Sequence, residues 1–570
     1  MILVCGFVAF PLASQDLRQY KEYDRYRYLP RLPSPSSKPT PFPFQQKELE
    51  GDDRVILDAL KSLIFLDDPE KLTARSIDAT GIQVNSESGL VILKDPEFQE
   101  IAGAYLGKPV SMRLLNELVR DVILFYRGQD RPVVDVSIPS NQEITNGVIQ
   151  ILITEAKVGR VIVQGSQFFD DDVLLKQPFI SPGDPVLESE LSKDLQWLNR
   201  NPFRKVDLKL TPGEKRGETD VVFNVEDDLP WRIYSGYEDT GTRSTGLERT
   251  FYGFNWFNAF NRDDQAGYQY TASSDFRKLG AHSAFYSRAL QNRDIVTLYG
   301  SYAEFTSPIA FFGTSSGVTW QVLGRKYHEL KSDGKYKQGF VSGFDVKQTN
   351  NNLDFGGALI FGEEVSIVQM MMGYQGRYED AYGSWNLGAD GYLSPGNIGG
   401  GNRSPTFQQV RPFSTANYFY ARGFLERRQS LNRNLELVGR FTGQLSEANL
   451  IVTEQLGLGG YNSVRGFDLY TAAQDSGFIL NLELHTKPIS LINSDDELKF
   501  LGFYDYGQGY NHTLLPGEAS TVRLQGIGAG LRYQLQSNIE LRADYGWQID
   551  SSATLISYRS RSHIGCVLSY

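Results

Sequence analysis

The sequence predicts two small α+β domains followed by a transmembrane antiparallel β-barrel of about 16 strands. The chain of 570 residues contains 31 Tyr, 34 Phe and 55 Gly but few Met and Cys, which is typical of β-structure that meets more than one solvent. Alternating segments recur from about residue 231 to the last residue, where helical stripes are hard to find. Two helical patterns, each flanked by strand patterns, precede that region.

The clearest alternation occurs in IELRADYGWQID, residues 539–550. Apolar side chains occupy one parity and mostly charged side chains the other, so a strand would place them on opposite faces, one toward lipid and one toward water. The remaining stretch of about 340 residues accommodates about 16 strands at roughly 20 residues per strand and connection. A soluble β-sandwich or propeller is the alternative, but closure into a barrel leaves no exposed strand edge in lipid.

Composition and spacing exclude several other classes. The formal net charge is -11, whereas nucleic-acid binders usually carry a basic footprint. The five histidines have no metal-ligand spacing, so neither a metal site nor a cofactor is predicted. Cys5 and Cys566 do not make a disulfide framework. GTSSG at 313–317 fits G-x-S-x-G, but a strand-like VTW follows it where a nucleophile elbow needs a helix. A glycine-serine loop is therefore expected there, with no catalytic residue and no enzymatic activity.

The first 54 residues predict export and a linker. The apolar run at 1–14 is shorter than the roughly 20 residues of a membrane-spanning helix, and predicts a signal peptide that is truncated at its start. A buried strand is the alternative. Residues 15–28 carry apolar side chains at i, i+3 spacing, which predicts a short helix. Prolines fill residues 29–54 and predict an extended linker, with a PxxP docking motif as the alternative.

Residues 55–156 predict the first α+β domain. The segment 111–128 places its apolar residues on one helical face, with Ser111 as the N-cap and Gly128 just past the helix end. The segment 133–156 then alternates and turns, which predicts a β-hairpin.

Residues 157–228 predict a second domain of the same kind. A strand ends at Gly165, and a helix follows with Asp184 at its N-cap and Pro185 at its first position. Two strands then flank a Pro-Gly turn at 212–213. The second domain follows the order β-α-α-β-β and the first follows it approximately, which makes a weak internal repeat of about 75–100 residues.

Five motifs occur in a fixed order along the chain. They are QEITNG at 142–147, LNRNPFRKVDLKLTPGEKRGETD at 198–220, VRGF at 464–467, FYDYG at 503–507 and HIGCVLSY at 563–570. With these motifs the chain resembles the TpsB (ShlB/FhaC/HecB) family, the outer-membrane transporters of two-partner secretion, within the superfamily that includes the BamA assembly factors. The resemblance covers nearly the whole mature chain and identifies the α+β domains as POTRA-like domains in the periplasm.

The resemblance also implies roles for particular residues. The pore-loop motif is Val464, Arg465, Gly466 and Phe467, and its barrel-wall partner motif is Phe503, Asp505 and Gly507. The POTRA structural positions are Gln142, Gly147, Gly165, Asn201, Pro202, Pro212, Gly213 and Gly217. The terminal insertion signal is Gly565, Leu568 and Tyr570. Residues 15–28 resemble the family's plug helix in position.

Alternation predicts how the two central motifs meet. Phe503, Asp505 and Gly507 share one strand face, while the opposite face is apolar and aromatic and should contact lipid. Asp505 should therefore point into the lumen, where an in-folded loop would bring Arg465 to it in a charge-assisted, bidentate pair. Gly466 would permit the close turn. A solvated loop arginine is the alternative.

The resemblance implies a function that needs no nucleotide, metal or catalytic group. An unfolded exported partner, a large TpsA-like protein of adhesin or haemolysin type, would add as a strand to a POTRA edge and thread through the barrel. A monomeric pore is expected in the outer membrane of a Gram-negative-type bacterium, inserted by the barrel-assembly machinery and surrounded by lipid, with no nucleic-acid partner. A BamA-like assembly factor and a plain porin are the alternatives. Two POTRA-like domains with a linker and plug favour secretion.

Overall fold

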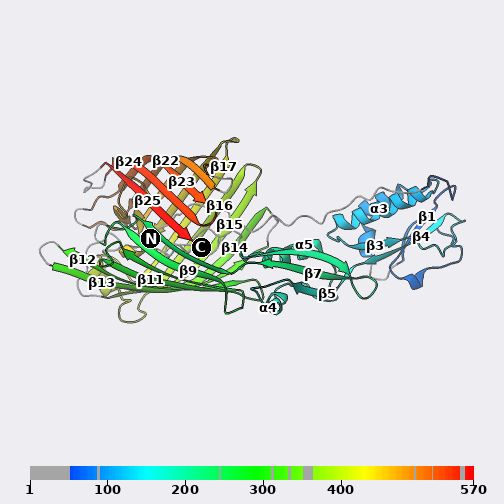
Figure 1. Ribbon diagram of the computed structural model, residues 1–570, viewed down its shortest axis with the longest axis horizontal. Helices are drawn as coiled ribbons and strands as arrows, with labels where there is room; N and C mark the ends of the chain where they lie inside the picture. Colours follow the sequence, from blue (N-terminus) through cyan, green and yellow to red (C-terminus); the bar gives the residue numbers. More distant parts are fainter. Residues whose placement is uncertain are drawn as a thin grey trace. The chain divides into compact units, whose positions relative to one another are not determined.

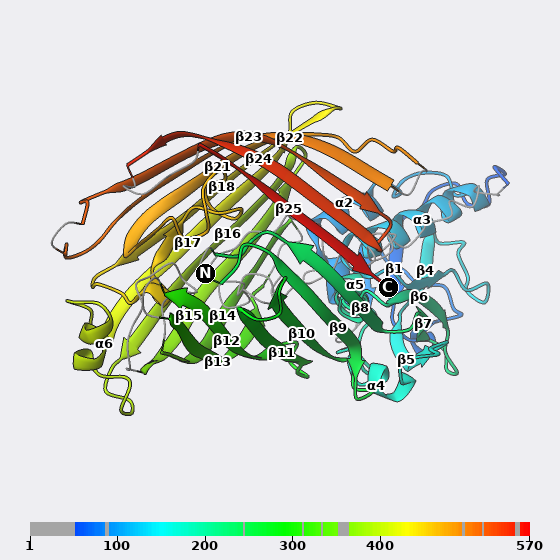
Figure 2. The same cartoon turned by 60° about the vertical axis from the view of Figure 1, so that its left-hand side comes forward.

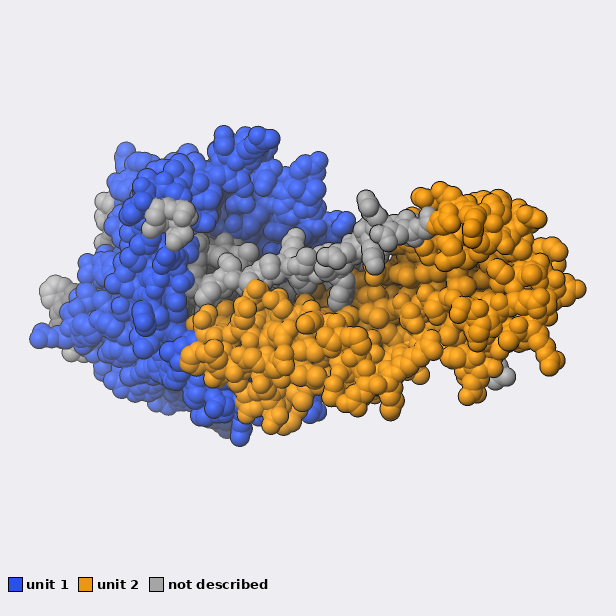
Figure 3. Space-filling model, turned by 45° about the vertical axis from the view of Figure 1, so that its right-hand side comes forward, with its two compact units in different colours: residues 1–34, 229–570 blue, residues 35–228 orange. Residues whose placement is uncertain are grey.

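The computed structural model describes residues 52–85, 90–242, 245–309, 313–331, 335–350, 364–492, 496–515, 518–552 and 559–570. They form two units, one ending at Asp228 and one beginning at Leu229, shown as ribbons in Figures 1 and 2 and in separate colours in Figure 3. The predicted signal peptide, the plug helix and the linker up to residue 51 lie outside the described residues. Among the residues described, no helix has the length and apolar character needed to cross a membrane.

The first α+β domain is a four-stranded sheet covered by helices (Figure 1). Its strands are β1 (Ser62–Leu66), β2 (Gly81–Asn85), β3 (Val134–Ser137) and β4 (Val148–Glu155), in the order β2-β1-β4-β3. Its helical elements are η1 (Pro69–Lys71), η2 (Val91–Lys94), α2 (Pro96–Gly103) and α3 (Met112–Gly128). Strand β1 runs parallel to β2 and β4, and β3 and β4 form the predicted antiparallel hairpin.

Helix α3 begins as the sequence predicts and ends one residue later. The Ser111 hydroxyl accepts a hydrogen bond from the Leu114 N–H at 3.2 Å, which is an N-cap contact. Gly128 was expected just past the end, but it is the last helical residue. The chain instead turns at Asp130, whose φ of 65° lies in the left-handed region that glycine usually occupies.

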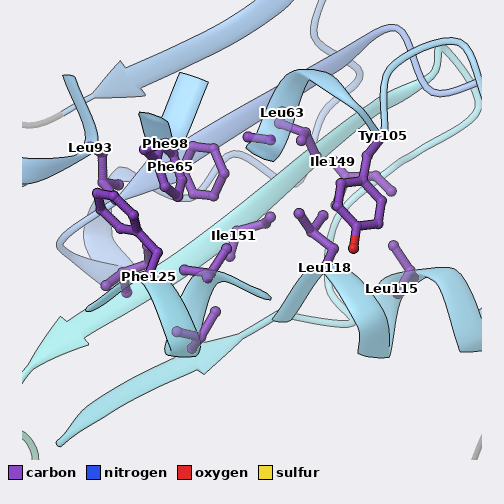
Figure 4. Close-up of a cluster of buried hydrophobic side chains, with 14 of the residues drawn as sticks. Leu63, Phe65, Leu93, Phe98, Tyr105, Leu115, Leu118, Phe125, Ile149 and Ile151 are labelled. Atoms are coloured by element: carbon purple, nitrogen blue, oxygen red, sulfur yellow. The ribbon is translucent and has the colours of Figure 1, made fainter. Parts of the chain in front are cut away.

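Aliphatic and aromatic side chains fill the core between α2, α3 and the sheet (Figure 4). The Phe98 ring lies 5.1 Å from Phe65 of β1 and 5.0 Å from Phe125 of α3, centroid to centroid. Phe98 has no exposed surface, so it joins both helices to the sheet by apolar burial, with an edge-on contact to Phe65 and a tilted contact to Phe125.

Replacing Phe98 by alanine should destabilise this domain by about 3–5 kcal/mol, because a buried ring leaves a cavity. The full-length Phe98→Ala protein should lose protease resistance in its α+β unit, while its barrel keeps the heat-resistant mobility of the folded form in gels. Leu124→Ala is the control, because Leu124 is an exposed residue of the same α3. Equal protease resistance of the two variants would contradict the expectation.

The second α+β domain contains a three-stranded sheet and two helices. Its elements are β5 (Lys157–Gln164), α4 (Asp171–Leu175), α5 (Glu188–Leu198), β6 (Arg204–Pro212) and β7 (Glu218–Asp227), with the strand order β5-β7-β6. Strands β6 and β7 form an antiparallel pair, whereas β5 runs parallel to β7. The two strands predicted around the Pro-Gly turn are confirmed.

The predicted start of helix α5 is wrong. The helix begins at Glu188, with Leu187 in the N-cap position, rather than at Pro185 after Asp184. The Asp184 carbonyl accepts the Val158 N–H at 2.8 Å, and its carboxylate accepts the Ser181 N–H at 2.8 Å. These bonds hold the segment beside β5 in an extended form. Asp184 therefore bonds to Val158 and Ser181 and does not cap the helix.

The first domain caps this helix instead. The Asp130 carbonyl accepts the Glu188 N–H at 3.1 Å, and its carboxylate accepts the Ser189 N–H at 2.7 Å and the Ser189 hydroxyl at 2.5 Å. A carboxylate at a helix N-terminus satisfies otherwise unpaired N–H groups and stabilises the helix dipole. Asp130 thus links the first domain to the helix start of the second.

The second unit is a closed antiparallel barrel of sixteen strands in the described part of the chain, which confirms the predicted fold class (Figure 2). Its strands are β8 (Trp231–Glu238), β9 (Arg249–Ala259), β10 (Asp264–Ser273), β11 (Leu279–Ala289), β12 (Ile295–Ile309), β13 (Gly313–Glu329), β14 (Tyr336–Thr349), β15 (Val365–Asp380), β16 (Gly383–Pro395), β17 (Asn417–Ser430), β18 (Leu435–Ser446), β21 (Ser476–Thr486), β22 (Asp496–Tyr510), β23 (Val522–Leu535), β24 (Ile539–Ser551) and β25 (Ser560–Ser569). The last strand pairs with the first, for example Leu568 with Ser235, and so closes the barrel.

The outer barrel surface is apolar, as the alternation predicts. On β24, Tyr545 and Trp547 are 44% and 49% exposed, whereas Asp544 of the same strand is 3% exposed. The outward face can therefore meet lipid while charged residues turn inward. The expected glycine-serine loop at 313–317 is wrong, because these residues begin β13 and pair with the end of β12.

Candidate functional site

A long loop between β18 and β21, residues 447–475, lies against the inner barrel wall. It contains η4 (Val452–Glu454) and a small antiparallel pair, β19 (Leu456–Leu458) and β20 (Ala472–Gln474), whose intervening residues carry the pore-loop motif. Five buried apolar residues of this loop pack on the inward side chains of β21 and β23. They are Leu456, Leu458, Val464, Phe467 and Tyr470, against Ile479, Val522 and Leu524. We refer to residues 447–475 as the pore loop.

The structure brings Arg465 of the pore loop against Asp505 of β22. The guanidinium Nε donates to Asp505 Oδ2 at 2.7 Å and Nη2 donates to Oδ1 at 2.8 Å, which is a bidentate pair. The Arg465 backbone N–H also donates to Oδ2 at 3.1 Å. The Phe503 ring lies 3.6 Å from the guanidinium carbon and adds a cation–π contact. Arg465 is 3% exposed and Asp505 is fully buried, so water scarcely screens the pair.

Further charges of the wall surround this pair. Arg465 Nη1 lies 2.9 Å from Glu483 Oε1 and 3.4 Å from Asp544 Oδ2. Glu483 also faces Arg440 at 3.3 Å, and Asp544 accepts two bonds from Arg532 at 2.6 and 2.9 Å. Three carboxylates on β21, β22 and β24 thus meet three guanidinium groups, of which Arg465 is the one that the pore loop supplies.

Asn481 is a site residue that sequence reasoning missed. Its side-chain N–H groups donate to Asp505 Oδ1 and to the Ser463 carbonyl, each at 2.7 Å. It therefore orients the carboxylate and holds the loop backbone beside the motif. Asn481 lies two residues before Glu483 on β21, so strand alternation places both side chains on the inward face, and this pattern could have identified Asn481.

Three glycines of the wall make room for the tip of the pore loop. A Cβ at Gly507 of β22 would lie 2.8 Å from Val464 Cγ2, and a Cβ at Gly546 of β24 would lie 2.5 Å from the Gly466 nitrogen. A Cβ at Gly526 of β23 would collide with the Arg465 carbonyl oxygen. Gly466 itself has a backbone φ of 95°, which residues with a side chain rarely adopt. We call Gly507, Gly526 and Gly546 the glycine track.

The predicted POTRA positions lie in the other unit and shape its turns. The Gln142 amide accepts the Gln150 N–H at 2.7 Å and donates to the Gln150 carbonyl at 2.8 Å, which closes the β3–β4 hairpin that contains Gly147. Gly165 follows β5 with φ of 99°, and a Cβ there would lie 2.7 Å from the Val225 carbonyl oxygen.

The remaining POTRA positions flank β6 and β7. Asn201 and Pro202 lie buried between α5 and β6, where the Asn201 amide oxygen accepts the Phe203 N–H at 3.2 Å. Pro212 ends β6, Gly213 begins the turn that Gly217 ends, and the Gly213 N–H donates to the Glu218 carbonyl at 2.9 Å.

The terminal residues complete the barrel seam. Gly565 pairs with Glu238 of β8, Leu568 is 51% exposed on the outer face, and the Tyr570 N–H donates to the Ile233 carbonyl at 2.8 Å. None of these three is at the Arg465 site. Within the described residues, no group of three or more His, Cys, Asp or Glu side chains could hold a metal ion.

Comparisons with known proteins agree with this architecture. A family model described as haemolysin secretion/activation protein ShlB/FhaC/HecB matches residues 217–533, and a POTRA model described as surface antigen variable number repeat matches residues 156–227. The heme/hemopexin transporter protein HuxB of Haemophilus influenzae is 25% identical over 484 residues, covering 79% of this chain and 80% of that protein. The outer membrane transporter CdiB of Dickeya dadantii is 21% identical over 472 residues, 80% of each chain.

Two solved structures share the fold. CdiB from Escherichia coli superimposes with a TM-score of 0.70 at 18% identity, covering 98% of this chain and 96% of that one. BamA from Haemophilus ducreyi lacking POTRA domains 1–3 gives a TM-score of 0.52 at 12% identity, covering 85% of this chain and 98% of that one. At these identities the likeness is one of fold.

Proposed function

Because the chain belongs to the haemolysin secretion/activation protein family ShlB/FhaC/HecB, an outer-membrane transporter family with periplasmic POTRA domains, we propose that it exports one or a few large unfolded TpsA-like partners. The observation that carries the proposal is the pore loop, which places a buried Arg465–Asp505 pair inside the barrel. Such a pair holds the loop in one position until a partner displaces it.

The proposed cycle uses no catalytic residue and no nucleotide. The partner, of adhesin or haemolysin type, arrives unfolded in the periplasm, threads past the pore loop and folds outside, and folding there prevents its return. The protein works as a monomeric pore in lipid, after the barrel-assembly machinery has inserted it. The proposed parts are residues 1–14 as signal peptide, 15–28 as plug, 29–54 as linker, 55–156 and 157–228 as POTRA-like domains, and 229–570 as barrel.

The site residues have separate roles in this proposal. Arg465 and Asp505 lock the pore loop, and Gly466 and Gly507 allow the tip to approach the wall. The POTRA positions keep the turns that shape the recognition sheets. Gly565, Leu568 and Tyr570 form the terminal signal for insertion into the membrane.

A POTRA edge is the proposed recognition surface. Strand β6 pairs with β7 on one side, and no other described strand pairs with it. On its outer edge the Val206 backbone already exchanges two hydrogen bonds with the Asn199 side chain, at 2.8 and 2.9 Å. Backbone N–H and C=O groups of every second residue point to the same edge of a strand. Those of Leu208 and Leu210 therefore point to the same free edge as those of Val206 and can pair with an added strand.

Leu208→Pro should weaken partner recognition, because proline removes the outward N–H and leaves the ladder to β7 in place. Each lost hydrogen bond costs about 0.5–1.5 kcal/mol, so we expect binding of the urea-unfolded partner to fall several-fold, with a parallel fall in export. Leu208→Thr is the matched control, since it retains the N–H and changes only the side chain. If both variants bind like wild type, β6 is not the recognition edge.

A depletion experiment distinguishes the proposed function from that of a BamA-like assembly factor. The protein is removed from its host, and proteins in the medium, on the surface and in the outer membrane are quantified. Loss of one or two large exported proteins with other barrels intact supports the proposed function. A broad fall in outer-membrane barrels would instead make the protein an assembly factor.

A further inference from the structure

The pore loop makes another buried polar contact with the barrel, ahead of its tip. Glu454 ends η4, and its carboxylate Oε1 lies 2.8 Å from the Lys347 ammonium of β14. The other oxygen, Oε2, accepts the Tyr420 hydroxyl of β17 at 2.7 Å and the Gln369 amide of β15 at 3.1 Å. Three different strands therefore hold one carboxylate of the pore loop.

Burial and charge make this contact more than a surface ion pair. Glu454 is 1% exposed and Lys347 is 7% exposed, so neither charge is solvated once the contact is made. The second carboxylate near Lys347 is Asp345, 3.9 Å away, which also pairs with Arg325. Withdrawal of Glu454 would leave Lys347 buried beside a carboxylate that is already shared, which is costly in a low-dielectric interior.

The Glu454 contact and the Arg465 contact lie on different sectors of the barrel. Glu454 is held by β14, β15 and β17, whereas Arg465 is held by β21, β22 and β24, and β18 separates the two sectors in the ring. The pore loop thus delivers a carboxylate to one sector and a guanidinium to the other. Opposite charges at these two contacts favour this placement of the loop over an exchanged one, and two further ion pairs of the loop, Asp468–Arg561 and Asp475–Arg411, also hold it.

We propose that Glu454 is a positioning residue that acts as a second latch of the pore loop, with Lys347 as its partner. The inference rests on the proposed function, since it concerns the loop past which the exported partner is proposed to thread. Loss of either the Glu454 contact or the Arg465 contact shifts the loop toward the unseated state. Other contacts remain in either case, because Arg422 and Gln444 donate to the Glu454 carbonyl at 2.9 and 3.0 Å. Asp475 and Asp468 also keep their ion pairs with Arg411 and Arg561.

Ion conductance of the purified full-length protein in planar bilayers tests the latch without any partner. Glu454→Gln keeps the shape and removes the charge, and Lys347→Met removes the other charge. Each should raise the open probability about tenfold, and the double variant should match either single variant if the two act as a pair. Tyr420→Phe removes one hydrogen bond to the carboxylate and should give a smaller rise.

Glu447→Gln is the matched control, since Glu447 is an exposed carboxylate of the same loop, and its open probability should equal that of wild type. Heat-resistant gel mobility verifies that each barrel is folded. Wild-type open probability in both Glu454→Gln and Tyr420→Phe, or additive effects of Glu454→Gln and Lys347→Met, would overturn the latch. Because conductance requires no partner, failure of the latch is distinct from failure of the depletion experiment to show lost export.

Discussion

Arg465→Ala should cut export of the partner about 100-fold while the barrel still inserts. Removing one member of a buried pair costs about 3–5 kcal/mol, and 1.4 kcal/mol is a tenfold change in an equilibrium. The lost stabilisation is that of the pore loop in its position against the wall, because Arg465 supplies the cation that Asp505 and Glu483 share. We expect export to start from this position of the loop, so its loss lowers export. Export is measured as partner in the medium, and insertion as heat-resistant protein in the outer membrane.

Two further variants show whether the pair acts as a unit. Asp505→Ala should resemble Arg465→Ala, and the double variant should cost little more than either single. Arg465→Lys keeps the charge but cannot reproduce the bidentate contact, so an intermediate loss is expected. Export of Arg465→Ala at the wild-type rate would contradict the role of the pair.

Gly546→Val should reduce export to a similar extent although every charged residue remains. A Cβ at this position lies 2.5 Å from the Gly466 nitrogen and 2.8 Å from the Arg465 carbonyl carbon, and both are backbone atoms that cannot rotate away. The tip of the pore loop must therefore move away from the barrel wall. This should both raise the open probability in planar bilayers and lower export.

Gly502→Val is the matched control for the glycine track. Gly502 lies on β22 near Asp505 but faces outward, and the nearest atom to a Cβ there is 3.9 Å away. This variant should export like wild type. Equal export by Gly546→Val and Gly502→Val would mean that the tip does not need its close approach to the wall.

The sequence predicts the parts of this site that depend on local pattern. Alternation alone orients Asp505 inward, and the VRGF and FYDYG motifs suggest that Arg465 is its partner. Alternation also predicts that Glu483 and Asp544 face inward, but no local sequence pattern predicts that both contact Arg465. That requires the register between β21, β22 and β24, which only the closed barrel sets.

Other features depend on residues far apart in the chain. Glu454 meets Lys347, 107 positions earlier, across strands that no short motif connects. The cap of α5 comes from Asp130, 59 positions before Ser189, so a local search for a capping residue selects Asp184 instead. Gly526 and Gly546 resemble ordinary strand glycines until the loop tip is placed against them.

The capping of α5 by Asp130 has a thermodynamic consequence for the two α+β domains. Part of the stability of the second domain is supplied by a residue of the first, since Glu188 and Ser189 donate to Asp130 and to no residue of their own helix start. Their unfolding is therefore cooperative: loss of the first domain weakens the second by about 1 kcal/mol, the usual value of an N-cap. By the same linkage, a ligand that stabilises one domain also stabilises its neighbour.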